Sequence, residues 1–485
     1  MNIQLSAVLA ASVIALSILV APAAQCANGI GPDKVVVSTD NGPVRGTVGS
    51  TTITFLGIPF AQPPVGELRW RPPEPYGRWH GILEANEFGP HCPQPLTSDQ
   101  SNSSEDCLFL NVYVPRDLGL ESNSASALHS SHVRRPVMVW IYGGANANGA
   151  SEFYDPTPLV ETGGVVAVTV NYRVGPFGFL AHPALEAEGH PAVNYGVMDQ
   201  QAALRWVRNN IDKFGGDQNN VTIFGESAGG LNVTTHLVSP LSAGLFDRAI
   251  IESGAYALAT PTLASSQAKG IAFANRVGCP DQTASCLRSK TTAEVLASAG
   301  NVNTPGSAYN QSTVDGQVLP EPQVSALAAG RFNRVPVLQG ANSMESNVFG
   351  CGARQSNQSL AEVVPTYAYE FGDVSASATG AQHGSEIKYL LNVAGVAPVA
   401  DGGPSTLPPA SQPLSLAMRR YWTTFAWSGD PNSIIVPPWP LASPFFDSVQ
   451  SLTPPLPHFD TTLAYGARHN CPAGGIFSAS APVNY

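Results

Sequence analysis

The sequence Val221-Thr222-Ile223-Phe224-Gly225-Glu226-Ser227-Ala228-Gly229-Gly230 decides the fold of this chain. Its first four residues are β-branched or aromatic, which predicts a buried strand, and the residues after Ser227 suit a helix. The Gly-x-Ser-x-Gly pattern between them predicts a sharp turn, where glycines are needed because a strained turn leaves no room for neighbouring Cβ atoms. A serine on such a turn forms a nucleophile elbow, so Ser227 is the predicted nucleophile.

Strand-like runs recur on both sides of this stretch and alternate with helical segments. This rhythm is typical of an α/β fold in which helices flank a mixed, mostly parallel sheet on both faces. We therefore predict a single large domain over residues 25–485, with loop insertions and no internal repeat. The predicted strands cover residues 35–38, 111–114, 137–142, 165–171, 221–224, 249–252 and 335–339.

The first 24 residues are predicted to be a signal peptide rather than part of the fold. Residues 5–20 are apolar except for three serines, and Ala21, Pro22, Ala23 and Ala24 follow as the small residues that a signal peptidase prefers. A membrane anchor is the alternative, but the stretch is shorter than the ~20 residues that a span needs. We expect the protein to be secreted and extracellular.

Seven cysteines in a secreted chain predict disulfides. Two pairs would each close a local surface loop, and a third pair would be long-range. The predicted pairs are Cys92 with Cys107 and Cys279 with Cys286, with Cys351 and Cys471 left as the long-range pair and Cys26 as the odd residue.

Five Asn-x-Ser/Thr sequences are candidate acceptors of N-linked glycans. Those at Asn102, Asn310 and Asn357 fall in segments that we expect to be polar loops. Those at Asn220 and Asn232 flank the nucleophile, where we expect burial.

The charge of the chain argues against nucleic acid or an anionic membrane as a partner. Acidic residues outnumber basic ones by 35 to 24, and the formal net charge is -11. No metal-binding cluster, phosphate-binding loop or dinucleotide fingerprint is recognisable, so we predict no metal site and no cofactor.

A serine hydroxyl becomes a good nucleophile only when a base takes its proton, and an acid must hold that base in the correct tautomer. In hydrolases with this elbow the chain order is Ser, then Asp or Glu, then His. Besides His236, three histidines follow Ser227, namely His383, His458 and His469. Their spacing does not choose among them.

Several motifs resemble the type B carboxylesterase family, which includes cholinesterases, liver-type carboxylesterases, fungal lipases and sterol esterases. The resemblance covers nearly the whole chain after the predicted signal peptide, and it implies an α/β-hydrolase fold and a serine carboxylic ester hydrolase. The motifs are FLGIPFAQPP at 55–64, SEDCLFLN at 104–111, FGG at 214–216 before GESAG at 225–229, FA at 425–426, GDPN at 429–432 and WP at 439–440.

The resemblance also implies the remaining members of a Ser-His-Glu triad. The acid of the family falls on Glu345 within GANSMES at 340–346, where Ser346 replaces the usual Gly. The base of the family falls on His383 within HGSEI at 383–387. Glu226, beside the nucleophile in the sequence, is expected to influence the histidinium that forms in the reaction.

The family's oxyanion hole falls on the backbone N–H groups of Gly144, Ala145 and Ala228. Ala145 stands where many members have a third Gly, but only its backbone is used. The next residue, Asn146, replaces a common aromatic. Two further charge pairs are expected to be structural, Arg69 with Glu105 and Arg173 with Asp199.

These features predict two-step acyl transfer on a small-molecule ester, with an acyl-enzyme intermediate. The loop 92–107 contains no Trp for contact with a quaternary ammonium, which argues against a cholinesterase. Leu96 is the single large apolar residue in that loop apart from proline, so an interface-sensing lid is not expected. We predict esters of short to medium acyl chains, with a lipase or sterol esterase as the alternative and a non-catalytic adhesion module as a remote one.

Overall fold

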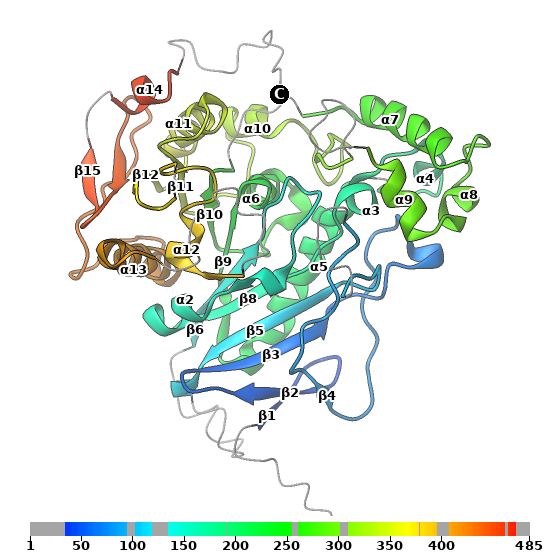
Figure 1. Ribbon diagram of the computed structural model, residues 1–485, viewed down its shortest axis with the longest axis horizontal. Coiled ribbons are helices and arrows are strands. Elements are labelled where there is room, and N and C mark those ends of the chain that lie inside the picture. Colours follow the sequence, from blue (N-terminus) through cyan, green and yellow to red (C-terminus); the bar gives the residue numbers. More distant parts are fainter. Residues whose placement is uncertain are drawn as a thin grey trace, which may run out of the picture. The chain divides into compact units, whose positions relative to one another are not determined.

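The computed structural model describes residues 34–94, 102–118, 134–191, 193–254, 260–300, 309–377, 379–394, 407–460 and 464–471. In this part of the chain, thirteen strands form one sheet in the order β1-β2-β3-β5-β8-β6-β9-β10-β11-β12-β14-β15, with β4 beside β2 (Figure 1). The sheet strands are β1 Lys34–Ser38, β2 Pro43–Val48, β3 Thr52–Pro59, β4 Leu83–Glu84, β5 Phe109–Pro115, β6 Arg135–Ile141, β8 Val166–Val170, β9 Gly216–Glu226, β10 Arg248–Glu252, β11 Val337–Asn342, β12 Thr366–Phe371, β14 Val449–Leu452 and β15 His458–Asp460.

The sheet is antiparallel at its two ends and parallel in between. Strands β8, β6, β9, β10, β11, β12 and β14 run parallel to one another, whereas β1, β2, β3 and β5 form antiparallel pairs. The parallel strands are buried along most of their length because helices cover both faces. A separate small ladder pairs β7 Tyr154–Asp155 with β13 Asn392–Val393.

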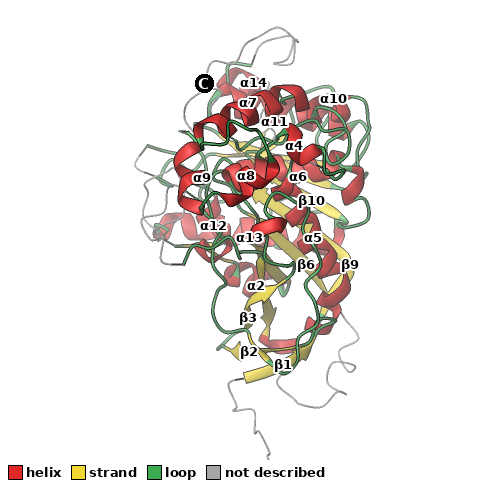
Figure 2. Cartoon of the chain, turned by 90° about the vertical axis from the view of Figure 1, so that its right-hand side faces the viewer, coloured by secondary structure: helices red, strands yellow, loops and turns green. Residues whose placement is uncertain are grey.

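Helices lie on both faces of the sheet (Figures 1 and 2). Helices α2 and α13 pack against each other on one face, and α5 and α6 lie on the other. The helices are α2 Thr157–Gly163, α3 Gly175–Phe179, α4 Pro183–Glu186, α5 Tyr195–Asn210, α6 Ala228–Val238, α7 Leu263–Arg276, α8 Ala284–Ser289, α9 Thr292–Ser298, α10 Gln323–Ala328, α11 Asn347–Ala361, α12 Ile387–Leu390, α13 Gln412–Ser428 and α14 Ala464–Arg468.

The predicted α/β fold is confirmed, and every predicted strand corresponds to a strand of the sheet. The prediction missed others, including β2, β3 and β12. Strand β2 begins at a proline and contains a glycine, two residues that are depleted in strands. Tertiary pairing with β1 and β3 overrides that preference.

Three disulfides are present in the structure, joining Cys92 to Cys107, Cys279 to Cys286 and Cys351 to Cys471. The first two join positions 15 and 7 apart in the sequence, and the third joins positions 120 apart. Cys26 and the predicted signal peptide lie outside the described residues. Among the described residues, no helix combines the length and the apolar character that crossing a membrane requires.

Both predicted structural charge pairs form. The guanidinium of Arg69 makes two hydrogen bonds to Glu105, of 2.7 and 2.5 Å. The guanidinium of Arg173 makes two to Asp199, of 2.8 and 2.7 Å, and both of these residues are almost fully buried.

The candidate glycan acceptors differ in accessibility. Asn102 and Asn310 are half-buried. The prediction of a polar loop at Asn357 is wrong, because this residue lies in α11, is 6% exposed and accepts a hydrogen bond from Gln339. Asn232 is buried as predicted, and Asn220 is only half-buried.

Candidate active site

Ser227 lies on the predicted turn between strand β9 and helix α6. Its backbone has φ 56° and ψ −123°, a conformation that side chains other than glycine rarely adopt. A Cβ on Gly225 would lie 2.4 Å from the carbonyl oxygen of Ile141, and one on Gly229 would lie 2.0 Å from the same atom. The glycines are therefore required by the close approach of the turn to the end of β6.

A hydrogen-bonded chain runs from Ser227 through His383 to Glu345. Nε2 of His383 lies 2.7 Å from Oγ of Ser227, and Nδ1 of His383 is hydrogen-bonded to Oε1 of Glu345. The second oxygen of Glu345 accepts hydrogen bonds from the Ser253 hydroxyl at 3.0 Å and the Asn342 backbone N–H at 2.8 Å. The acid is thus held on both oxygens, and it can fix the tautomer in which Nε2 accepts the serine proton.

The parallel sheet brings these side chains together. Ser227 follows β9, Glu345 follows β11, and His383 lies in the segment after β12. The carboxyl ends of parallel strands meet at one edge of the sheet, where ligand sites of α/β proteins form. The ring of Phe349, in the first turn of α11, packs on His383 with ring centroids 4.4 Å apart.

The other candidate histidines have different environments. His458 lies in the outermost strand, β15, and is exposed. Nε2 of His469 is 3.0 Å from Glu370, and the buried His236 is bonded to Ser242 and Gln200. The structure therefore brings His383 alone of these four to Ser227.

Two carboxyl groups, those of Glu226 and Glu345, contact His383, and further buried carboxyl groups belong to the same region of the fold. Oε1 of Glu226 lies 3.3 Å from Nε2 of His383. Burial raises the pKa of Glu226 to about 7 and that of Glu252 to about 8, and burial also raises the pKa of Glu386 well above its ordinary value. Burial lowers the pKa of the His383 imidazole, but the charges of Glu226, Glu345 and Glu386 outweigh this effect and raise it above 6.5.

The predicted oxyanion-hole residues lie beside Ser227. Gly143 lies in the loop after β6, and a Cβ added there would lie 3.0 Å from Cβ of Ser227. Gly144 and Ala145 follow with φ of 95° and 56°. Ala228 is the first residue of α6, so its N–H has no acceptor within the helix and is free for an oxyanion. The catalytic roles of the triad and of these N–H groups stay predictions.

Sequence reasoning missed several polar side chains that brace this site. The Asn232 amide donates to Asn146 at 2.8 Å, and the Asn310 amide donates to the carbonyl oxygen of Ala145 at 2.8 Å. Ser253, also missed, follows β10 directly. Its place next to the serine-bearing strand β9 is a signal that could have identified it.

One group of potential metal ligands occurs among the described residues. Cys279, Asp281 and Cys286 lie close to one another. The two cysteines form a disulfide, so they lack the thiolates that would bind a metal ion.

The elbow and its position on a mixed sheet define the α/β-hydrolase class. The chain belongs to the carboxylesterase family, whose family model matches residues 33–351 and 346–456. A solved structure of a thermophilic PNB esterase is similar, with a TM-score of 0.75 and 29% sequence identity over 88% of this chain and 97% of that chain.

Three curated relatives have esterase names. Fumonisin B1 esterase of Sphingopyxis macrogoltabida is 40% identical over 329 residues, or 65% of this chain and 57% of that protein. Para-nitrobenzyl esterase of Bacillus subtilis is 37% identical over 327 residues, or 65% of this chain and 63% of that protein. Human cocaine esterase is 32% identical over 480 residues, or 80% of this chain and 81% of that protein. The chain therefore spans less than two thirds of the first two relatives.

The buried Glu252 should make stability depend on pH. Its pKa is raised from 4.5 to about 8, so the folded protein retains a proton that the unfolded chain releases between these values. The free energy of unfolding should fall as pH rises through this window, by up to about 1.4 kcal/mol per pH unit for this group. The Trp422 indole donates to Glu252 at 2.8 Å, and Glu252→Gln keeps an acceptor for this hydrogen bond. The introduced glutamine does not ionise at any pH of the experiment. Urea unfolding should show the variant gaining stability over wild type from pH 5 to pH 8.

Glu370→Gln is the matched control. Burial opposes ionisation of Glu370, but hydrogen bonds from His469 and Arg468 outweigh it and lower its pKa. The control should therefore change stability equally at pH 5 and pH 8. A Glu252→Gln difference that is also constant over this range would contradict the raised pKa.

Proposed function

We propose that this protein is a serine hydrolase of carboxylic esters, with Ser227 as nucleophile, His383 as base and Glu345 as the acid that orients it. The hydrogen-bonded chain through these three side chains, ending on a nucleophile elbow, carries the proposal. The esterase names of the relatives support it. Because all three side chains are present and aligned, an enzyme is favoured over a non-catalytic adhesion module.

The reaction would proceed by two acyl transfers. Oγ of Ser227 attacks the ester carbonyl as Nε2 of His383 takes its proton, and the imidazolium then gives that proton to the leaving alcohol. Water, deprotonated by His383, hydrolyses the acyl-enzyme in the second step and releases the acid. Glu345 stabilises the imidazolium in both steps, and Glu226 adds a second charge at 3.3 Å.

Negative charge on the carbonyl oxygen would be stabilised by the N–H groups of Gly144, Ala145 and Ala228. Such donors act because they are fixed before the charge develops. Ala145 has a left-handed backbone conformation, which glycine would adopt at less cost because it has no Cβ. Contacts from neighbouring residues must therefore hold Ala145 in this conformation.

The substrate would be a small ester with a short to medium acyl chain. The support comes from the loop 92–107, which is short and polar, although its residues 95–101 lie outside the described part. A lipase or sterol esterase of the same family is the second candidate.

The protein would be secreted after removal of residues 1–24. The three disulfides support this, because disulfides persist in oxidising compartments. Asn102 and Asn310 are the more accessible of the candidate glycan acceptors in polar segments.

Ser227→Ala should lower ester turnover by several orders of magnitude, because it removes the covalent route. The melting temperature should change little, since the side chain contacts His383 at the surface of the site. An organophosphonate should label wild type once, at Ser227, as mapped by mass spectrometry of peptides. Labelling of another serine would contradict the assignment.

The pH dependence of kcat/KM should report the charges around His383. The reaction needs the neutral imidazole, whose pKa is raised, so kcat/KM should fall as pH drops through a value above 6.5. Glu226→Gln removes a charge that favours the imidazolium, so the midpoint should move to lower pH. Glu370→Gln, in strand β12 and hydrogen-bonded to His469 and Arg468, serves as the control and should leave the midpoint in place. An unchanged midpoint in Glu226→Gln would show that Glu226 does not act on His383.

Ester kinetics should separate an esterase from a lipase. Because loop 92–107 contains Leu96 as its one large apolar residue apart from proline, it should not act as a lid that opens at an oil surface. The rate on tributyrin should therefore saturate below its solubility limit and show no jump above it. The initial rate is measured by titration of released acid on both sides of that limit. A several-fold jump would favour the lipase or sterol esterase alternative, with another segment acting as the lid.

A further inference from the structure

The loop that would form the oxyanion hole has an unfavourable backbone conformation. Gly144, Ala145 and Asn146 are consecutive residues with φ of 95°, 56° and 54°. For the two that are not glycine, this left-handed conformation is unfavourable, and it persists only where surrounding contacts enforce it. Contacts at the far end of the loop, at Gly149, help to enforce this conformation.

Gly149, at the end of this loop, packs against Tyr142 and Gly143 at its start. It has φ 115°, and a Cβ there would lie 2.5 Å from Cδ2 of Tyr142 and 2.9 Å from the carbonyl oxygen of Gly143. Residues 143 and 149 are therefore in contact, and the residues between them form a compact ring. Any shift of Gly149 would be transmitted to the two predicted oxyanion donors within that ring.

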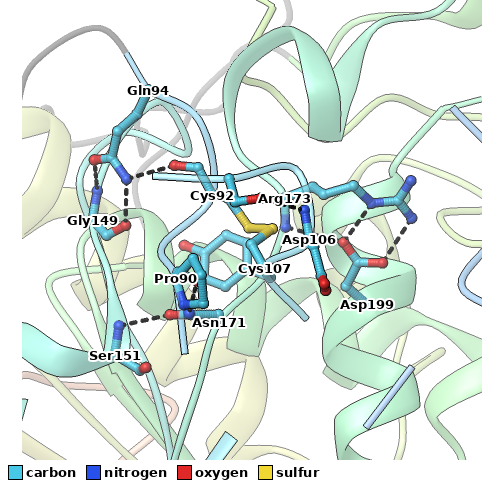
Figure 3. Close-up of a disulfide and its surroundings, with 12 residues drawn as sticks. Pro90, Cys92, Gln94, Asp106, Cys107, Gly149, Ser151, Asn171, Arg173 and Asp199 are labelled. Carbon is cyan, nitrogen blue, oxygen red and sulfur yellow. Dashed lines mark hydrogen bonds and ion pairs between the residues drawn. A yellow bond between two sulfur atoms is a disulfide. The ribbon is translucent and has the colours of Figure 1, made fainter. Parts of the chain in front are cut away.

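A single side chain holds both polar backbone atoms of Gly149 (Figure 3). The N–H of Gly149 donates to Oε1 of Gln94 at 2.8 Å, and Nε2 of Gln94 donates to the carbonyl oxygen of Gly149 at 2.9 Å. The same Nε2 donates to the carbonyl oxygen of Cys92 at 3.0 Å. Gln94 is 1% exposed, so these hydrogen bonds are shielded from water.

The Cys92–Cys107 disulfide fixes the position of Gln94. Cys92 is fully buried, and Cys107 lies two residues before strand β5. On the other side, Asn171 after β8 donates to the carbonyl oxygen of Pro90 at 3.0 Å and accepts from the N–H of Ser151 at 2.9 Å (Figure 3). The segment that carries Gln94 and the end of the oxyanion loop are thus tied to the same sheet.

We propose that Gln94 is a positioning residue for the oxyanion hole. Its amide locks Gly149, and through the closed loop it orients the N–H groups of Gly144 and Ala145. This inference rests on the proposed ester hydrolysis. It also gives the Cys92–Cys107 disulfide a role in this protein, which is to hold the amide of Gln94 against the loop that would form the oxyanion hole.

The two hydrogen bonds between Gln94 and Gly149 require an amide side chain. Gly149 has one donor, its N–H, and one acceptor, its carbonyl oxygen, and a primary amide can bond to both because it has an acceptor and a donor of its own. Methionine has the length of glutamine but would leave both groups of Gly149 buried and unsatisfied. An ionised carboxylate could accept but could not donate, and it would face the carbonyl oxygen of Gly149. A protonated carboxyl group could again do both.

The first test compares Gln94→Met with Gln201→Met. Gln201 is also 1% exposed and donates two hydrogen bonds, to Ser239 and Ser242, but no hydrogen bond joins it to the oxyanion loop. For each variant, kcat and KM are measured on p-nitrophenyl butyrate, and the melting temperature is measured as well. The inhibition constant of a trifluoromethyl ketone is the third measurement, because the adduct of this inhibitor with the serine places an oxyanion in the hole.

Gln94→Met should lower kcat by about 10- to 100-fold, which is less than the loss of a whole oxyanion donor. KM should change little, and the ketone should bind more weakly by a factor similar to the loss in kcat. Gln201→Met should lower the melting temperature but leave kcat and ketone binding within about threefold. Wild-type kcat and ketone binding in Gln94→Met, or equal losses in the control, would overturn the proposal.

Gln94→Glu supplies a second test that survives poor folding of the first variant. The ratio of its kcat to that of wild type should be low at pH 8 and should rise toward pH 5.5 as the introduced carboxyl gains a proton. A merely structural role predicts a ratio that is flat with pH, and this result would contradict the inference.

If wild type hydrolyses no ester, the proposed function fails and the inference with it. If wild type is active and both Gln94 variants are unaffected, the inference alone fails.

Discussion

The contact between the turn at Ser227 and the end of strand β6 is the constraint on which the site depends. Two glycines, Gly225 and Gly229, approach the same carbonyl oxygen, that of Ile141, more closely than any side chain would permit. This approach lets β9 run in register beside β6 and then reverse at once into α6. The serine is thereby fixed in a strained conformation, and the loop that follows β6 starts beside it.

The buried acids near the active site differ in the number of hydrogen-bond donors that they accept from. Glu345 accepts hydrogen bonds from His383, Ser253 and the backbone of Asn342, and these donors suit a carboxylate. Glu252 has a single indole donor, and burial raises its pKa to about 8, so it stays protonated at neutral pH. Because a buried charge without partners is costly, burial favours the neutral form of an acid that has few hydrogen-bond donors, as it does for Glu252.

The sequence was sufficient where function requires a local pattern. Val221 to Gly229 specify a strand, a turn and the nucleophile, since the steric demands of the turn are satisfied within a few residues. Spacing could not choose among His383, His458 and His469, because the distance between a histidine and Ser227 depends on strand order. Only the resemblance to a family pointed to His383. Asn357 was misplaced for a related reason, since its polar neighbours hide the fact that one face of α11 is buried.

By itself, the sequence determined the α/β class, the elbow and the two local cysteine pairs, because each of these follows from residues that lie close together in the chain. Only the tertiary structure decided that Oε1 of Glu226 lies 3.3 Å from Nε2 of His383, and that Gln94 is hydrogen-bonded to Gly149, which is 55 positions away in the sequence. Such contacts join residues from different strands and loops. Their geometry follows from strand order, register and shared burial, and these are properties of the whole fold rather than of any segment.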